Sequence, residues 1–154
     1  MQLSEILRPD AVKVVSSSTS KKRLFQELGD IAEASYGLDA GLVVESLIDR
    51  ESLGPTGVGH GVALPHARLE GMEGLAGIFV VLEKPVDFSS PDREPVDLVF
   101  ALFAPVDAGV EHLKALALIS RTLKDANSRT KLRSNPNPTA LYAILTESVT
   151  TKAA

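Results

Sequence analysis

One stretch of sixteen residues, Leu53–Arg68, constrains this chain more than any other part of its sequence. It holds four glycines, two prolines and two of the three histidines. Such a density of glycine and proline excludes a regular helix or a central strand, because glycine costs backbone entropy and proline lacks the N–H that both structures use. We therefore expect a loop here, and its histidines indicate that the loop carries chemistry.

The composition is typical of a soluble protein. With 154 residues, 44% hydrophobic and 23% charged, the chain is expected to form a single domain, residues 1–154, around a hydrophobic core. The apolar runs are shorter than the roughly 20 residues of a membrane-spanning helix, so no membrane insertion is expected. The N-terminus lacks a signal-peptide pattern and there is no cysteine, so we expect a cytoplasmic protein. A net charge of −4, with five Phe and two Tyr, argues against a nucleic-acid surface.

Hydrophobic patterning predicts an α/β fold. The β-branched segment Val12–Val15 and the apolar runs Leu75–Leu82 and Val96–Ala104 predict strands, and Val62–Leu64 also has strand character. Helices are predicted at Lys21–Tyr36 between Ser20 and Gly37, from Asp39 to about Leu53, and at Gly109–Lys124, Arg129–Arg133 and Thr139–Glu147. Residues 149–154 are expected to form a frayed tail. This order favours a layered α/β sandwich.

The histidines do not fit three common kinds of site. His60, His66 and His112 lack the compact ligand spacing of a metal site. The chain has no Gly-x-Ser-x-Gly elbow for a serine nucleophile. The run Gly57–Gly61 lacks the Gly-Lys-Ser/Thr ending of a nucleotide-binding loop. We expect neither a metal nor a cofactor.

What remains is a histidine that acts as a nucleophile toward phosphorus. Neutral imidazole has a lone pair near physiological pH and can accept a phosphoryl group and later release it. Pro65 holds Leu64 extended and withholds an N–H, so we expect His66 to emerge at the end of a strand, where α/β sheets place ligands.

Phosphoryl transfer requires positioned donors, and the sequence offers several. Arg50 follows an apolar helix row to the last turn, where it either complements the helix C-terminus or clamps an anion. His112 stands in the first turn of a helix, either as a packed core residue or as a donor beside the anion. We assign a phosphate cradle to the loop residues Thr56, Gly57, Gly59, His60 and Gly61. The alternative for His60 is an exposed loop residue. The basic cluster Lys21–Arg23 is either a solvated first turn or a docking patch for an acidic partner.

The run Gly57–His66, GVGHGVALPH, resembles the signature of the enzyme IIA domains of the phosphoenolpyruvate-dependent sugar phosphotransferase system (PTS), in the fructose/mannitol class. In that signature the last histidine is the phosphorylated one. The likeness covers nearly the whole chain and includes Ser20–Arg23, Arg50–Gly54, Pro95–Leu102 and Glu111–Leu113. Within the class, the chain is most similar to the nitrogen-regulatory branch.

This resemblance implies a three-layer α/β/α sandwich around a small mixed β-sheet. It also implies a phosphotransferase with a phosphohistidine intermediate: an HPr-type phosphocarrier donates to Nε2 of His66, and Arg50 and His112 line the site. Position 60 departs from the pattern, because some members of this branch carry asparagine where this chain has His60. The implied targets are potassium transporters, their sensor kinases, and nitrogen- or stress-response regulators.

Two other functions stay open at this point. A sugar-transport IIA subunit would pass its phosphoryl group to a IIB partner. A non-catalytic binding module would be recognised by its conformation or surface charge alone. We expect a regulatory phosphocarrier, because the chain has no membrane segment and no attached domain with a phosphorylatable cysteine.

Overall fold

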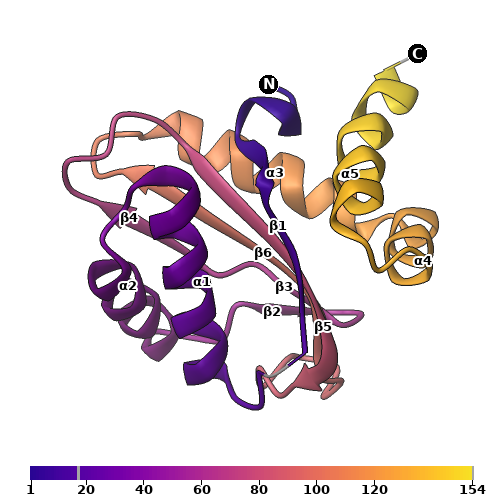
Figure 1. Cartoon of the computed structure of the whole chain (residues 1–154), viewed down its shortest axis with the longest axis horizontal. Helices are drawn as coiled ribbons and strands as arrows, with labels where there is room; N and C mark the ends of the chain where they lie inside the picture. The colour runs from indigo at the N-terminus through magenta and orange to yellow at the C-terminus, as the bar shows by residue number, and fades with distance from the viewer. Residues whose placement is uncertain (17, 154) are drawn as a thin grey trace.

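The computed structural model describes residues 1–16 and 18–153, with side chains described up to residue 147. Within these residues, six strands form one mixed sheet between two layers of helices (Figure 1). The strands are β1 (Leu7–Val15), β2 (Gly57–Gly59), β3 (Val62–Ala63), β4 (His66–Leu69), β5 (Ala76–Val86) and β6 (Val96–Pro105). The helices are a 3₁₀ turn η1 (Leu3–Glu5), α1 (Lys21–Tyr36), α2 (Ala40–Ser52), α3 (Val110–Lys124), α4 (Ala126–Ser134) and α5 (Pro138–Ala153).

The sheet is built around β5 and β6, which pair antiparallel at its centre. The strand order is β1-β5-β6-β3-β2, and β4 also pairs with β6. Strands β3 and β4 follow one another along the same edge of β6, both parallel to it, with Val62 opposite Leu98 and His66 opposite Leu102. Figure 1 shows α1 and α2 on one face and α3, α4 and α5 on the other. The predicted three-layer α/β/α fold is confirmed.

The expected loop is partly wrong: β3 lies where Val62–Leu64 was expected to have strand character, but β2 also lies inside the stretch and β4 begins near its end. Glycine-rich β2 pairs antiparallel with β3 as an edge hairpin, and an edge strand tolerates residues that a central strand would not. His66 does not end a strand but begins β4. Leu64 and Pro65 interrupt the edge between β3 and β4, and the Pro65 carbonyl accepts a hydrogen bond from the Leu102 N–H at 3.0 Å.

The first strand starts earlier than predicted, at Leu7 instead of Val12. Its pairing with β5 is irregular between Leu7 and Val12. Pro9 falls within this irregular segment, where a missing N–H removes no ladder bond. The sequence pattern did not show this start, because the residues before Val12 do not alternate.

The capping predictions for the first two helices are confirmed. The Ser20 hydroxyl accepts from the Arg23 N–H, Gly37 ends α1 with φ of 69°, and the Asp39 carboxylate accepts from the first-turn N–H groups of α2. The bounds of the later helices were less accurate. α4 begins at Ala126, capped by Asp125, and α5 continues to Ala153 in place of the expected end at Glu147. Of the expected tail, residue 154 lies outside the described residues.

Helices α1 and α2 pack closely against each other because of one glycine. A Cβ on Gly29 of α1 would come within 2.9 Å of both the Ala40 carbonyl and the Val44 side chain of α2. On its other side α2 packs against β4, the strand that carries His66. Among the described residues, no helix has the length and apolar character needed to cross a membrane.

Candidate functional site

Three elements that are distant in the sequence meet at one pocket of about 660 Å³. Helix α2 contributes Arg50 in its last turn, β4 contributes His66 and Arg68, and α3 contributes His112 in its first turn. The rest of the lining consists of two apolar residues, two serines and an exposed carboxylate: Leu53, Ala67, Ser46, Ser52 and Asp49. The structure thus brings together the expected phosphoryl acceptor, His66, and the two residues expected to assist it, Arg50 and His112.

The two nitrogens of His66 have different partners. Nδ1 lies 2.8 Å from the Leu64 carbonyl oxygen, and Nε2 lies 3.4 Å from Nε of Arg50. A carbonyl accepts and a guanidinium N–H donates, so Nδ1 carries the proton and Nε2 presents its lone pair. Burial has the largest effect on the pKa of His66 and lowers it, and the Arg50 charge lowers it further. The hydrogen bond to the Leu64 carbonyl and the charge of Glu51 raise this pKa. The neutral, nucleophilic form is therefore favoured at neutral pH.

His112 is held beside His66 by an arginine that sequence analysis did not select. The two imidazole rings meet edge to face with centroids 5.6 Å apart. Nε of Arg68 donates to Nδ1 of His112 at 3.1 Å, so the proton of neutral His112 lies on Nε2. That Nε2 is buried and has no hydrogen-bond partner among the described residues. Burial, followed by the charges of His66 and Arg68, lowers the pKa of His112 to about 4.

A simple signal could have identified Arg68. Residues i and i+2 of a strand point to the same face of a sheet, and Arg68 stands two positions after His66. An exposed arginine on the same face as a candidate phosphoryl acceptor is a candidate for a second cation that binds the phosphoryl oxygens. The assisting residues expected from the sequence, Arg50 and His112, both lie on helices, and the strand before Pro65 was not expected to continue beyond it.

Arg50 binds the C-terminal end of α2, the first alternative considered for it, and it also lies at the pocket, where the second alternative, an anion clamp, requires it. Its Nη1 donates to the Gly54 carbonyl at 3.0 Å, just beyond the end of α2. Its Nε faces His66. One guanidinium therefore binds the backbone at the helix C-terminus and lies at the pocket, because the guanidinium group presents several donors in a fixed fork.

The five residues assigned to a phosphate cradle do not line this pocket. Thr56 is buried, and its N–H and hydroxyl donate to Glu51. Gly57 packs against Phe88 and Ser90, since a Cβ there would meet both side chains.

Of the other three cradle residues, Gly59 ends β2, and His60 and Gly61 form the turn between β2 and β3, where His60 adopts a positive φ of 57°. The His60 N–H donates to Asp92 and its carbonyl accepts from Arg133. His60 and Gly59 face a second cavity of about 290 Å³, beside Ser120, Leu123 and Lys124 of α3.

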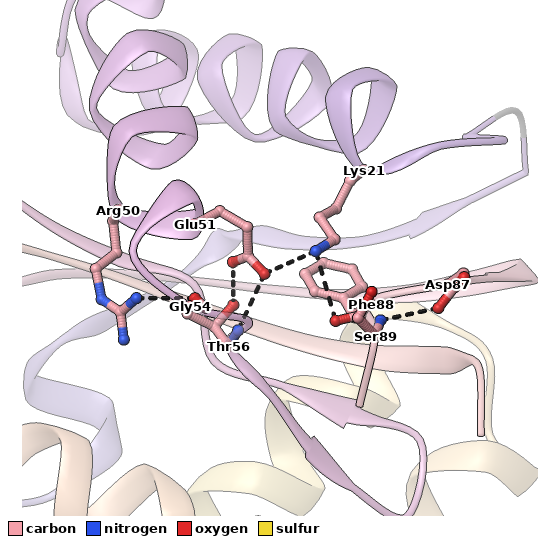
Figure 2. A network of polar contacts seen from close by, with 8 residues as sticks. All are labelled: Lys21, Arg50, Glu51, Gly54, Thr56, Asp87, Phe88 and Ser89. Atoms are coloured by element: carbon pink, nitrogen blue, oxygen red, sulfur yellow. Dashed lines mark hydrogen bonds and ion pairs between the residues drawn. The ribbon is translucent and has the colours of Figure 1, made fainter. Parts of the chain in front are cut away.

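Of the basic cluster, Lys21 has defined partners in the structure. Its ammonium lies 2.9 Å from the Glu51 carboxylate and donates to the Phe88 carbonyl at 3.4 Å. It also lies 5.0 Å from the centre of the Phe88 ring. Figure 2 shows this contact beside Glu51 and Thr56. Lys21 is thus engaged within the fold, whereas Lys22 and Arg23 are exposed.

Comparison with known proteins establishes the family. Residues 5–148 match the family described as "Phosphoenolpyruvate-dependent sugar phosphotransferase system, EIIA 2". The chain therefore belongs to this family, a phosphotransfer component of the PTS, and the family resemblance seen in the sequence is confirmed.

Individual relatives point to the regulatory branch. A protein of Bradyrhizobium diazoefficiens named "Nitrogen regulatory protein" is 43% identical over 145 residues, which cover 94% of this chain and 95% of that protein. The crystal structure of nitrogen regulatory protein IIA-Ntr from Neisseria meningitidis is 38% identical with a TM-score of 0.86, covering 94% of this chain and 99% of that chain.

The IIA mannitol structure from Escherichia coli is 18% identical with a TM-score of 0.75, covering 90% of this chain and 97% of that chain. It supports the fold alone. Together, the family and its nitrogen-regulatory relatives make this chain a PTS-related regulator.

Proposed function

We propose that this chain is a cytoplasmic regulator that accepts a phosphoryl group on Nε2 of His66 from an HPr-type phosphocarrier. The observation that carries the proposal is the pair of contacts on the His66 ring. Nδ1 is occupied by the Leu64 carbonyl, and Nε2 faces Arg50 in an open pocket. The Nε2 lone pair is therefore held toward the open pocket by a long 3.4 Å hydrogen bond from Arg50, which an incoming phosphorus displaces.

In the proposed transfer, the Nε2 lone pair attacks the phosphorus of the carrier's phosphohistidine. A new P–N bond forms as the old one breaks, and its electron pair returns to the carrier's imidazole nitrogen. The Nδ1 proton of His66 stays in place, and the Leu64 carbonyl stabilises the positive charge that develops on the ring. Arg50 and Arg68 line the pocket and supply donors for the phosphoryl oxygens, and the buried Nε2–H of His112 becomes a further donor when its ring turns toward the phosphoryl group.

An apolar rim around the pocket supports a protein as the phosphoryl donor. Leu53 is 84% exposed, and Val110 and Leu113, on either side of His112, are 61% and 63% exposed. Val106, beside Arg68, is also exposed. Exposed apolar side chains that gather around a site are typical of a surface that a protein partner covers.

The regulatory role is proposed from the nitrogen-regulatory relatives. Phosphorylation adds roughly −1.5 to −2 charges at neutral pH, and here it does so within the apolar rim. We propose that targets such as potassium transporters, sensor kinases or nitrogen- and stress-response regulators distinguish the two forms. Pull-downs with phosphorylated and unphosphorylated protein should recover different partners. Recovery of a IIB partner that takes the phosphoryl group would instead assign the chain to sugar transport.

Transfer itself is tested with a phosphoenolpyruvate-fed HPr-type carrier and labelled phosphate. Wild type should acquire one acid-labile phosphoryl group, and His66→Ala should acquire none. Arg50→Ala and His112→Ala should each slow transfer on the order of 10–1000-fold while the fold is kept, since each removes a few kcal/mol of charge stabilisation. Equal labelling of wild type and His66→Ala would refute the assignment.

A further inference from the structure

Glu51 is a nearly buried carboxylate that the proposed transfer does not use. Its side chain is 8% exposed. Oε2 accepts from Nζ of Lys21 at 2.9 Å and from the Thr56 N–H at 3.0 Å, and Oε1 accepts from the Thr56 hydroxyl at 2.6 Å. Both oxygens are satisfied and the charge is paired, as a buried carboxylate requires. Glu51 thus connects three segments: the start of α1, the end of α2 and the residues before β2.

Thr56 links this carboxylate to the backbone carbonyls that hold His66 and Arg50. The Thr56 carbonyl accepts from the Leu64 N–H at 3.0 Å, and the Leu64 carbonyl accepts from Nδ1 of His66. Two residues before Thr56, the Gly54 carbonyl accepts from Nη1 of Arg50. Figure 2 shows Arg50 on one side of Gly54 and Thr56, and Lys21 on the other.

Little else holds the segment that carries the Gly54 carbonyl. Leu53 is 84% exposed. Among the residues that the structure describes, no atom lies within 4 Å of the position that a Cβ on Gly54 would take. The backbone leaves α2 through hydrogen bonds from the Leu53 and Gly54 N–H groups to Arg50 and Glu51 carbonyls, and its next anchor is Thr56.

We infer that Glu51 is a positioning residue that acts through Thr56. Glu51 fixes the position of Thr56. Thr56 in turn determines where the Gly54 carbonyl, which binds Arg50, and the Leu64 backbone, which binds His66, are placed. Lys21 neutralises the carboxylate and ties the start of α1 to the same point. The activity part of this inference rests on the proposed function, whereas the effect on Arg50 and His66 geometry does not.

The test compares Glu51→Gln with wild type in two measurements. Glutamine keeps the shape of the side chain but has one acceptor oxygen and no charge. Transfer from the phosphocarrier should show kcat lowered about 10–100-fold, the effect of misplacing a reacting group by about 1 Å, with KM changed less than about threefold. In NMR of unphosphorylated protein, the Arg50 Nε–H signal should exchange faster with solvent, and the His66 Nε2 signal should shift.

Four further variants separate positioning from loss of stability. Asp97→Asn is the matched control: it breaks a two-bond ion pair with Arg133, remote from the pocket, and should leave kcat and both signals unchanged. Thr56→Val, which lacks the hydroxyl, should show the same changes in kcat and in the two NMR signals as Glu51→Gln. Thr56→Ser, which keeps the hydroxyl, should show wild-type kcat and signals. Glu51→Gln should lower kcat by a smaller factor in an Arg50→Ala background than in wild type, because part of its effect on kcat depends on Arg50.

The outcomes are distinct. Wild-type kcat and unchanged Arg50 and His66 signals in folded Glu51→Gln would overturn the inference. So would an equal loss in Asp97→Asn, because the effect would then be general destabilisation. If wild type itself takes up no phosphoryl group, the proposed function fails, and the NMR comparison alone still decides whether Glu51 positions the two side chains.

Discussion

At the scale of single residues, tautomers determine what this site can do. In each histidine of the pocket the partner of Nδ1 fixes the tautomer: this partner is the Leu64 carbonyl for His66 and the Arg68 guanidinium for His112. His66 is left with a lone pair and His112 with a donor, which are the two kinds of group that phosphoryl transfer requires. Sequence patterns could select His66, Arg50 and His112, but not their hydrogen-bond partners, because these depend on tertiary contacts.

The tautomer of His112 can be tested through Arg68. In long-range ¹H–¹⁵N spectra of wild type, neutral His112 should carry its proton on Nε2, because Arg68 donates to Nδ1. Arg68→Met removes that donor, and the spectra should move toward a mixture of the two tautomers. Finding the proton on Nδ1 in wild type would show that Arg68 does not set the tautomer.

The lowered pKa of His112 has a consequence for stability. Its pKa falls from 6.5 to about 4 in the folded protein, so below pH 6.5 the unfolded chain binds a proton that the folded chain rejects. The stabilisation is complete above pH 6.5 and is lost as the pH falls toward 4. Urea unfolding at pH 7.5 and pH 5 should therefore show a larger drop in free energy for wild type than for His112→Gln. Equal drops would contradict this assignment.

At the scale of elements, the interrupted edge strand is the feature that sequence analysis described least well. Hydrophobic patterning predicted the central strands β5 and β6, because their long apolar runs are covered on both faces. It did not predict β2 or β4. These strands are short, and they are defined by their pairing with β3 and β6, which no local pattern encodes. Because these pairings were not predicted, the glycine-rich turn around His60 was expected to line the pocket. In the structure the β2–β3 hairpin places this turn beside Asp92 and Arg133 instead.

The contact between α1 and α2 offers a test at this scale. Gly29→Ala should destabilise the protein by about 1–3 kcal/mol, because the new methyl group meets the Ala40 carbonyl and forces the helices apart. This sign is opposite to the helix propensity of alanine. Gly41→Ala in α2, where a Cβ comes near only the Asp39 carboxylate, should stay within about 0.5 kcal/mol of wild type. Urea unfolding measures both, and a stabilised Gly29→Ala would contradict the packing described.

At the scale of the whole molecule, the sheet serves to assemble one pocket from three distant segments. The family resemblance in the sequence correctly predicted the fold class and the grouping of Arg50, His66 and His112. It did not indicate that Arg68 joins them, nor that Glu51 and Thr56 lie behind them. Those contacts follow from the packing of α2 on β4 and from the course of the chain between residues 53 and 66, which are properties of the assembled fold.

Transfer of a phosphoryl group to Nε2 of His66 can be tested at the level of the atom by one NMR experiment. Protein labelled with ¹⁵N in its histidines should be phosphorylated by an HPr-type carrier and examined by ¹⁵N and ³¹P NMR. We predict a single phosphohistidine, with phosphorus coupled to Nε2 of His66 and the Nδ1 proton retained by the Leu64 carbonyl. Phosphorus on Nδ1 of His66, or on His60 or His112, would contradict the account.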